Sequence, residues 1–258
     1  MHLIAIGEIF LKGKNRILFE RRLLKNIRSA LNLKENDLIK FRNRYLIKDD
    51  INVAKLKQIF GIIFYVKVNE CKADNINETA LSLIKNEKTF RVSAKKSLSL
   101  NKSSTTLNEE VGSYILDKKP SLKVNLDNPE IDIRLEELRN NFYVYRNSDL
   151  EKGLGGLPLG TSGFVHLIVN DEIKSTVSAF LIMKRGCVVS VSKDLPLIHK
   201  VSHGFNLRIR EEKEFDIIAT DEVFENLNIK EENKMILRPL IGYSEKEIKE
   251  LYEKIKNL

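Results

Sequence analysis

Residues 155–186, GGLPLGTSGFVHLIVNDEIKSTVSAFLIMKRG, hold the pattern that decides the fold of the second half of the chain. A short apolar run rich in β-branched residues, 164–169, follows two glycines and predicts a buried strand. From Lys174 the apolar residues recur at helical spacing, and Gly186 lies where that helix should end. A second strand is expected over 187–191. These segments predict a strand–helix–strand unit of a parallel sheet, in which the loop after the first strand faces the ligand-binding edge.

The same stretch resembles the junction of tRNA 4-thiouridine synthetases (tRNA sulfurtransferases). There a GGLPxGTSG-like linker precedes a strand, the ATP-pyrophosphatase loop SGGxDS (the PP-loop) and a helix that ends in MKRG. Two glycines of this loop let backbone N–H groups surround the phosphates of ATP. Aligned without gaps, the loop falls on residues 170–175 of this chain. The resemblance therefore places the nucleotide-binding position at Asn170, Asp171, Glu172, Lys174 and Ser175.

That loop has changed in this chain. Of the fixed positions of the family loop, only Ser175 keeps the family's residue. Asp171 and Glu172 replace the glycines, which adds Cβ atoms and puts two carboxylates where anionic phosphates would lie. Lys174 replaces the family's aspartate and offsets only part of that repulsion. We therefore expect that ATP binding is lost and that the protein uses no cofactor.

Composition favours a globular protein without a membrane segment. The chain has 258 residues, of which 42% are hydrophobic and 31% charged, a length that allows about two domains. No apolar run approaches the roughly 20 residues that span a bilayer. Residues 1–9 are too short for a signal peptide and carry Glu8 too early. We expect a cytoplasmic location and no membrane association.

The cysteines and histidines indicate neither a disulfide nor a metal site. Cys71 and Cys187 lie far apart and have no neighbouring cysteine or histidine cluster, which predicts two buried, reduced thiols. The role of Cys187, which opens the second expected strand, stays open. His199 and His203 share a helical spacing, but no third ligand lies near them in the sequence. We predict no metal site.

Positive charge is concentrated in two segments. The net charge is +8; residues 1–48 hold 12 Lys and Arg against 4 Asp and Glu, and residues 88–123 hold 8 against 3. Such clustering indicates either a face that binds a polyanion and releases counterions, or the solvated surface of a lysine-rich protein. Charge alone leaves both alternatives open.

Residues 1–70 are expected to form a small ferredoxin-like module. The hydrophobic pattern predicts strands over 3–6, 41–48 and 62–69, a helix that starts at Lys14 or Asn15, and a second helix over 53–60. The stretch GEIFLKGKNRILFERRLLKNIRSAL, residues 7–31, resembles the opening of the same synthetase family. Two separate motifs in the family's order make the resemblance specific.

Residues 71–150 carry a third resemblance. Helices are expected over 76–85 and 105–118, the second capped by Ser103 or Ser104, with strands over 89–94, 122–126, 131–135 and 142–145. The segments FRVSAKK and LNEEVGSYIL resemble the THUMP domain, an RNA-binding module that in this family holds the acceptor end of tRNA. This implies phosphate contacts, each weighed against a solvated surface charge, at Arg91, Lys95, Lys96 and Lys102. In the basic N-terminal module we expect further RNA contacts at Lys12, Lys14 and Arg16.

After a glycine-rich linker, residues 151–163, the resemblance returns in two segments. In DIIATDE, residues 216–222, Asp221 stands for the glycine of the family's TGE motif and Glu222 keeps its glutamate. The segment MILRPLIGYSEKEI, residues 235–248, matches the family closely. No cysteine occurs over 193–215, where the family has the reactive cysteine of sulfur delivery, and we expect the family's further C-terminal part to be missing. Residues 164–258 are therefore interpreted as a degenerate PP-loop domain.

The fold class expected from these patterns is α/β. Ferredoxin-like and THUMP modules of α+β type should precede a truncated Rossmann-like domain with a parallel sheet. Two functions follow from the resemblance. The first is a tRNA-binding protein without ATP chemistry of its own, and the alternative is a divergent tRNA sulfurtransferase that acts alone or with a separate catalytic subunit. The resemblance also implies a possible homodimer.

Overall fold

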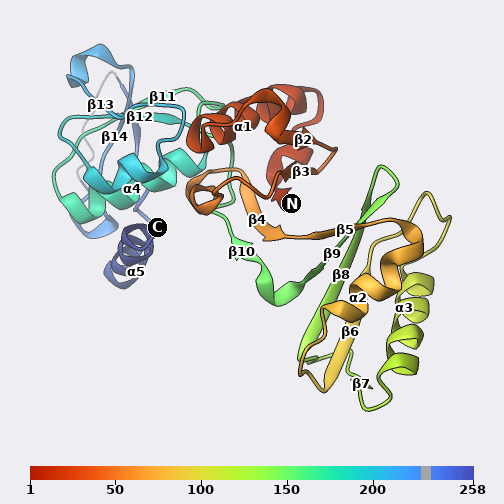
Figure 1. Ribbon diagram of the computed structural model, residues 1–258. Coiled ribbons are helices and arrows are strands. Elements are labelled where there is room, and N and C mark those ends of the chain that lie inside the picture. The colour runs from red at the N-terminus through yellow and green to blue at the C-terminus, as the bar shows by residue number, and fades with distance from the viewer. Residues whose placement is uncertain (228–233) are drawn as a thin grey trace. The chain divides into compact units, whose positions relative to one another are not determined.

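The described residues of the structure, a computed structural model, are 1–227 and 234–258, and they form three five-stranded sheets (Figure 1). Contacts divide the chain into two compact units. One unit contains Met1–Ile4, Leu38–Asp50 and Phe64–Glu151, and the other contains Ala5–Asp37, Ile51–Ile63 and Lys152–Leu258. The mixed α/β class predicted from the sequence is confirmed. Within the described ranges, no helix combines the length and apolar character that a membrane span requires.

The N-terminal sheet has the order β10-β4-β1-β3-β2. The helix α1 (Arg16–Leu31) lies between β1 and β2 in the sequence. Its strands are β1 (His2–Ile6), β2 (Leu38–Lys40), β3 (Arg44–Ile47), β4 (Ile62–Lys67) and β10 (Glu151–Lys152).

Two sequence predictions for this segment were wrong. The expected strand 41–48 begins only at Arg44, because residues 41–43 form the turn of the hairpin between β2 and β3. The expected helix 53–60 is a short 3-10 helix, Ala54–Gln58. A segment of eight residues gains too few i→i+4 hydrogen bonds to offset the cost of nucleating an α-helix.

The middle sheet has the order β5-β9-β8-β6-β7. Two helices, α2 (Ile76–Ser82) and α3 (Ser104–Lys118), cover one face and bury an apolar core against it (Figure 1). The predicted cap of α3 is confirmed, since the Ser103 hydroxyl accepts a hydrogen bond from the Thr106 N–H at 3.0 Å. The strands are β5 (Asn69–Cys71), β6 (Thr89–Ala94), β7 (Lys123–Val124), β8 (Ile131–Leu138) and β9 (Asn141–Arg146).

The C-terminal sheet is parallel throughout, with the order β13-β12-β11-β14-β15. The predicted strand–helix–strand unit is confirmed as β11 (Phe164–Leu167), α4 (Glu172–Lys184) and β12 (Val188–Val191). A buried apolar cluster joins this sheet to α4 and to α5 (Glu245–Lys256). The remaining strands are β13 (Arg208–Ile209), β14 (Ile217–Ala219) and β15 (Met235–Leu237).

The glycine-rich linker binds the end of α4. The N–H groups of Gly160, Thr161 and Ser162 donate to the Gly186 carbonyl at 2.8, 2.9 and 3.1 Å, and the Leu157 N–H donates to the Lys184 carbonyl at 2.9 Å. Gly186 has a φ of +89°, and a Cβ there would lie 2.4 Å from the Thr161 hydroxyl. Backbone hydrogen bonds therefore join the GGLPLGTSG and MKRG segments of the sequence.

Candidate functional site

The loop that the family alignment assigns to nucleotide binding joins β11 to α4. Asp171 caps the helix, because its carboxylate accepts a hydrogen bond from the Lys174 N–H at 2.8 Å. Asn170, Asp171 and Glu172 are exposed, whereas Ser175 lies inside the domain with none of its surface exposed. The first residue of α4 is Glu172, so the helix begins two residues before Lys174, where the sequence pattern predicts its start.

A carboxylate of the chain itself occupies the centre of this loop. Asp221 follows β14, which pairs with β11, and parallel strands end at the same edge of the sheet. Its carboxylate accepts hydrogen bonds from the N–H groups of Asn170 and Asp171 at 3.1 and 2.7 Å and from the Ser175 hydroxyl at 2.7 Å. The Asn170 side-chain amide adds a fourth at 3.0 Å. Backbone and hydroxyl donors in this arrangement suit an anion, and here the anion is Asp221.

These contacts keep Asp221 ionised although it is only 5% exposed. Burial pushes the pKa of its carboxyl upward, but the hydrogen bonds from Asp171, Asn170 and Ser175 outweigh burial, and the pKa lies below its ordinary value. A buried carboxylate with four donors is a stable occupant of the loop. The sequence shows the aspartate in place of a glycine but does not show that its side chain turns towards residues 170–175.

The charged neighbours of the loop are also paired. The Lys174 ammonium lies 2.7 Å from the Glu245 carboxylate, and the hydrogen bond with Glu245 raises the pKa of Lys174. Glu222, the residue of the family's TGE motif that this chain keeps, accepts hydrogen bonds from Arg238 at 2.8 Å and from the Thr220 hydroxyl at 3.1 Å. Lys174 is thus held by α5, and the nearby charges of Asp171 and Asp221 raise its pKa further.

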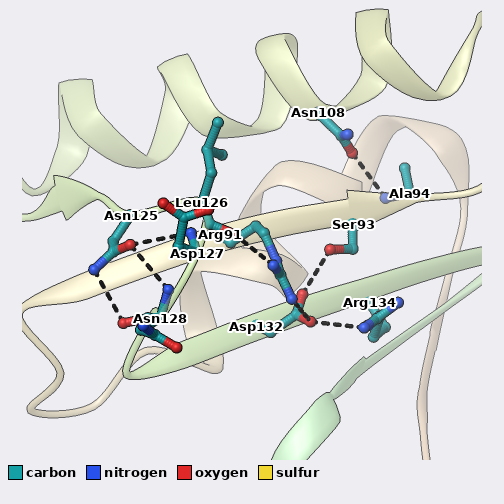
Figure 2. Close-up of polar contacts among 10 residues, drawn as sticks. All are labelled: Arg91, Ser93, Ala94, Asn108, Asn125, Leu126, Asp127, Asn128, Asp132 and Arg134. Atoms are coloured by element: carbon teal, nitrogen blue, oxygen red, sulfur yellow. Dashed lines mark hydrogen bonds and ion pairs between the residues drawn. The ribbon is translucent and has the colours of Figure 1, made fainter.

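A second polar cluster lies on the face of the middle sheet opposite α2 and α3. Residues of β6 and β8 face each other in register, and Figure 2 shows Arg91 and Arg134 on either side of Asp132. Both guanidinium groups contact the same carboxylate oxygen, at 2.6 and 2.8 Å, and the Ser93 hydroxyl donates to the other oxygen at 2.7 Å. Arg91 also donates to the Leu126 carbonyl at 2.6 Å.

The side chains of Arg91, Asp132 and Arg134 together carry one net positive charge, and the hydrogen bond with Asp132 and the nearby charge of Asp127 both raise the pKa of Arg91. Burial pushes the pKa of Asp132 upward, but the Arg91 and Ser93 hydrogen bonds and the nearby Arg134 lower it below its ordinary value. Two cations and one anion remain, with 29% of the Arg91 side chain and 37% of the Arg134 side chain exposed. Asp132 and Arg134 were not predicted as functional residues, although both alternate with the apolar residues of the predicted strand 131–135.

The other predicted RNA-binding residues of this unit lie near the same strands. The Lys95 ammonium is 2.8 Å from Glu136, a nearly buried carboxylate that also pairs with Arg44 at 2.9 Å. Lys102 pairs with Glu110 at 2.7 Å, and Lys96 is exposed.

The three predicted N-terminal residues belong to the other compact unit. The Lys12 ammonium lies 5.4 Å from the centre of the Phe19 ring, and Lys14 is exposed. Arg16 pairs with the buried Glu20 at 2.7 Å. Of the seven positions predicted to contact RNA, four therefore lie in one unit and three in the other.

The two histidines and the two cysteines lie in separate environments. The helical segment at Pro196–Val201 is a 3-10 helix that ends before His203; His199 contacts Asp194 at 2.8 Å, and His203 contacts Gln58 at 3.3 Å. Over the described ranges no group of His, Cys, Asp and Glu is placed to hold a metal ion. Cys71 and Cys187 are free, but they are half-buried and not buried as predicted. Their partial burial raises the pKa of both thiols, which disfavours the reactive thiolate.

Comparisons with known proteins identify two domains and several relatives. Residues 1–66 match the ThiI ferredoxin-like domain, and residues 72–147 match the THUMP domain. The chain is 37% identical over 192 residues to a probable tRNA sulfurtransferase of Mycoplasmopsis agalactiae, which covers 73% of this chain and 50% of that protein. With the probable tRNA sulfurtransferase of Geobacillus kaustophilus it shares 35% identity over 229 residues, 84% of this chain and 55% of that protein. The chain thus spans about half the length of the curated relatives it matches.

Two solved structures share the fold. The crystal structure of PH1313 from Pyrococcus horikoshii has a TM-score of 0.81 and 27% identity, and the match covers 99% of both chains. A 4-thiouridine synthetase solved with RNA and ATP has a TM-score of 0.77 and 24% identity, covers 98% of this chain and 84% of that one, and shows likeness of fold. With its ferredoxin-like and THUMP domains matched in order and its sulfurtransferase relatives, the chain belongs to the tRNA sulfurtransferase, or 4-thiouridine synthetase, family.

Proposed function

We propose that this protein binds tRNA and has no ATP-dependent catalysis of its own. In this proposal the basic N-terminal and THUMP domains hold the acceptor end of the tRNA, and the C-terminal domain no longer binds ATP. The observation that carries the proposal is the occupation of the loop at residues 170–175 by the Asp221 carboxylate.

The loss of ATP binding follows from competition for the same donors. A phosphate of ATP at this loop needs the N–H groups and the hydroxyl that Asp221 already engages. Entry of a phosphate would also bring it against Asp171 and Glu172, two further carboxylates at the loop. Because Lys174 is paired with Glu245 at 2.7 Å and is also shared with Asp171 and Asp221, its charge offsets only part of that repulsion.

The binding of tRNA is supported by the THUMP match and by the charge of the middle unit. The Arg91 and Arg134 guanidinium groups are partly exposed and are kept in place by Asp132, which lowers the entropy that each would lose on contacting a phosphate. Lys95 and Lys96 continue the positive charge at the end of β6. Contacts of this kind recognise the backbone and shape of RNA rather than its base sequence.

The names of the curated relatives favour a second candidate function. They are probable tRNA sulfurtransferases, so this chain would be a divergent sulfurtransferase that acts in tRNA thiolation alone or with a separate subunit. Such a subunit would have to supply the ATP loop and a cysteine with a low pKa, because burial raises the pKa of the thiol of Cys187. Co-purification of a protein with both features would favour this candidate over the first. A homodimer also remains a prediction.

Filter binding over a series of salt concentrations tests the RNA half of the proposal. If several phosphates are neutralised, the logarithm of the association constant for tRNA falls linearly with the logarithm of salt concentration, by about 0.7–0.9 for each phosphate contact. We expect a steep slope and a preference for tRNA over an unstructured polyanion such as heparin. A flat response, or equal affinity for both, contradicts the proposal.

A further inference from the structure

A cavity of about 940 Å³ opens on the C-terminal domain, away from the Asp221 loop. It is lined at Phe164 and Val188, the first residues of β11 and β12, whereas the Asp221 loop follows the last residue of β11. All its lining residues belong to the same compact unit. Its volume lies within the range of roughly 300–1,000 Å³ in which protein pockets hold small organic ligands.

Three phenylalanines form the aromatic part of the lining. Phe215 stacks on the buried His166 with ring centres 4.9 Å apart and an angle of 13° between the planes. Phe205 carries the Arg22 guanidinium 5.1 Å from its ring centre. These contacts fix two rings in place. Phe164, by contrast, is 67% exposed, which leaves a large apolar ring open to solvent at the cavity.

Two arginines supply positive charge to the cavity lining. Arg208 and Arg210 are exposed and line it. Arg210 lies 3.7 Å from the Glu214 carboxylate, and no ion pair engages Arg208 within the part of the chain that the structure describes. The lining therefore combines stackable rings with a guanidinium group that is available for an anion.

From this combination we propose that the cavity binds a nucleotide, with its base against Phe164 and its phosphate at Arg208. Aromatic rings beside cationic side chains are the arrangement by which proteins bind unpaired bases without reading their sequence. Two sources have this chemistry, an unpaired nucleotide of a bound RNA and a free mononucleotide. The RNA source rests on the proposed function, whereas the free nucleotide does not.

Equilibrium binding to the full chain tests the proposal with two probes that are each titrated directly, a fluorescently labelled single-stranded RNA hexanucleotide and fluorescently labelled AMP. The variants are Phe164→Ala and Arg208→Ala, and the matched control is Phe224→Ala, which removes a phenylalanine that is 71% exposed and does not line the cavity. We expect Phe164→Ala to weaken hexanucleotide binding by about tenfold, the loss typical of one stacked base, with a similar loss for Arg208→Ala and none for the control.

The probes separate the two sources and the two proposals. Dependence on Phe164 for the hexanucleotide supports the RNA source, and dependence for AMP alone supports a free nucleotide. If the wild-type protein binds neither probe, or if neither affinity changes in Phe164→Ala and Arg208→Ala, both folded by circular dichroism, the cavity is not a nucleotide site. Intact tRNA measured in parallel reports on the proposed function, because its failure to bind the wild-type protein overturns that function while the AMP result still decides the cavity.

Discussion

Replacing Asp221 by alanine removes the carboxylate from the loop at residues 170–175 and leaves its donors in place. Asp221 does not have a positive φ, so alanine adopts its backbone conformation without strain. The variant therefore isolates the loss of the carboxylate. Two effects are expected, a loss of folding stability and the appearance of an anion site.

The loss of stability is worked from the four hydrogen bonds. The Ser175 hydroxyl belongs to a fully buried residue, and leaving it without its acceptor costs about 1–3 kcal/mol. The N–H groups of Asn170 and Asp171 and the Asn170 side-chain amide belong to exposed residues and can bind water instead, so each net loss is about 0.5–1.5 kcal/mol. Relief of the cost of burying a charge offsets part of this sum. We expect Asp221→Ala to lower the free energy of unfolding by about 2–4 kcal/mol.

The assay is denaturant unfolding of both proteins with and without inorganic phosphate at constant ionic strength. Phosphate bound to the vacated donors stabilises the variant by about 1.4 kcal/mol at ten times its dissociation constant. The wild-type protein, whose donors are engaged, gains nothing. Asp216→Ala, which removes an exposed carboxylate of the same unit, is the matched control and should change neither quantity. Equal stabilisation of the wild type and the variant by phosphate refutes the view that Asp221 occupies an anion site.

Four further outcomes are expected. Because the pKa of Asp221 is lowered in the fold, its advantage over Asp221→Asn in unfolding experiments should be complete above about pH 4 and disappear as the pH falls further. Gly186→Ala should lower the free energy of unfolding by at least about 1 kcal/mol, since φ is +89° and Thr161 blocks the new Cβ, whereas Gly242→Ala, with nothing within 4 Å, should be almost neutral. Lys96→Ala should reduce the salt slope of tRNA binding by about 0.7–0.9 if this lysine contacts one phosphate, and an unchanged slope removes it from the interface. Asp132→Asn should cost about 1–3 kcal/mol in thermal or denaturant unfolding, because two partly buried guanidinium groups lose their partner; unchanged stability would show that the pairs contribute nothing.

Much of the fold was predictable because its periodic segments are long or β-branched. Residues 89–94 were predicted as a strand with the same bounds as β6, and the Ser103 cap follows from a local rule. The structure differs from the sequence predictions where contacts between distant segments determine the conformation. The linker, residues 151–163, was predicted from its glycines as a domain junction, and the structure shows that its N–H groups bind the end of α4.

The candidate sites were predicted less completely, because they depend on pairs of residues far apart in the chain. The sequence drew attention to Asp171 and Glu172, yet the residue that fills the loop is Asp221, about fifty positions later and brought there by the pairing of β14 with β11. Likewise Arg91 was predicted as a phosphate contact, but its partners Asp132 and Arg134 are set by the register of β6 with β8. Local patterns carry no information on such registers.

Release of pyrophosphate from labelled ATP by the pure protein with tRNA tests the central claim most directly. The account predicts tRNA binding in the same sample and no pyrophosphate above the level of a protein-free control, because Asp221 holds the donors that the phosphates of ATP need. Pyrophosphate release that depends on both the protein and tRNA would contradict the claim that ATP chemistry has been lost.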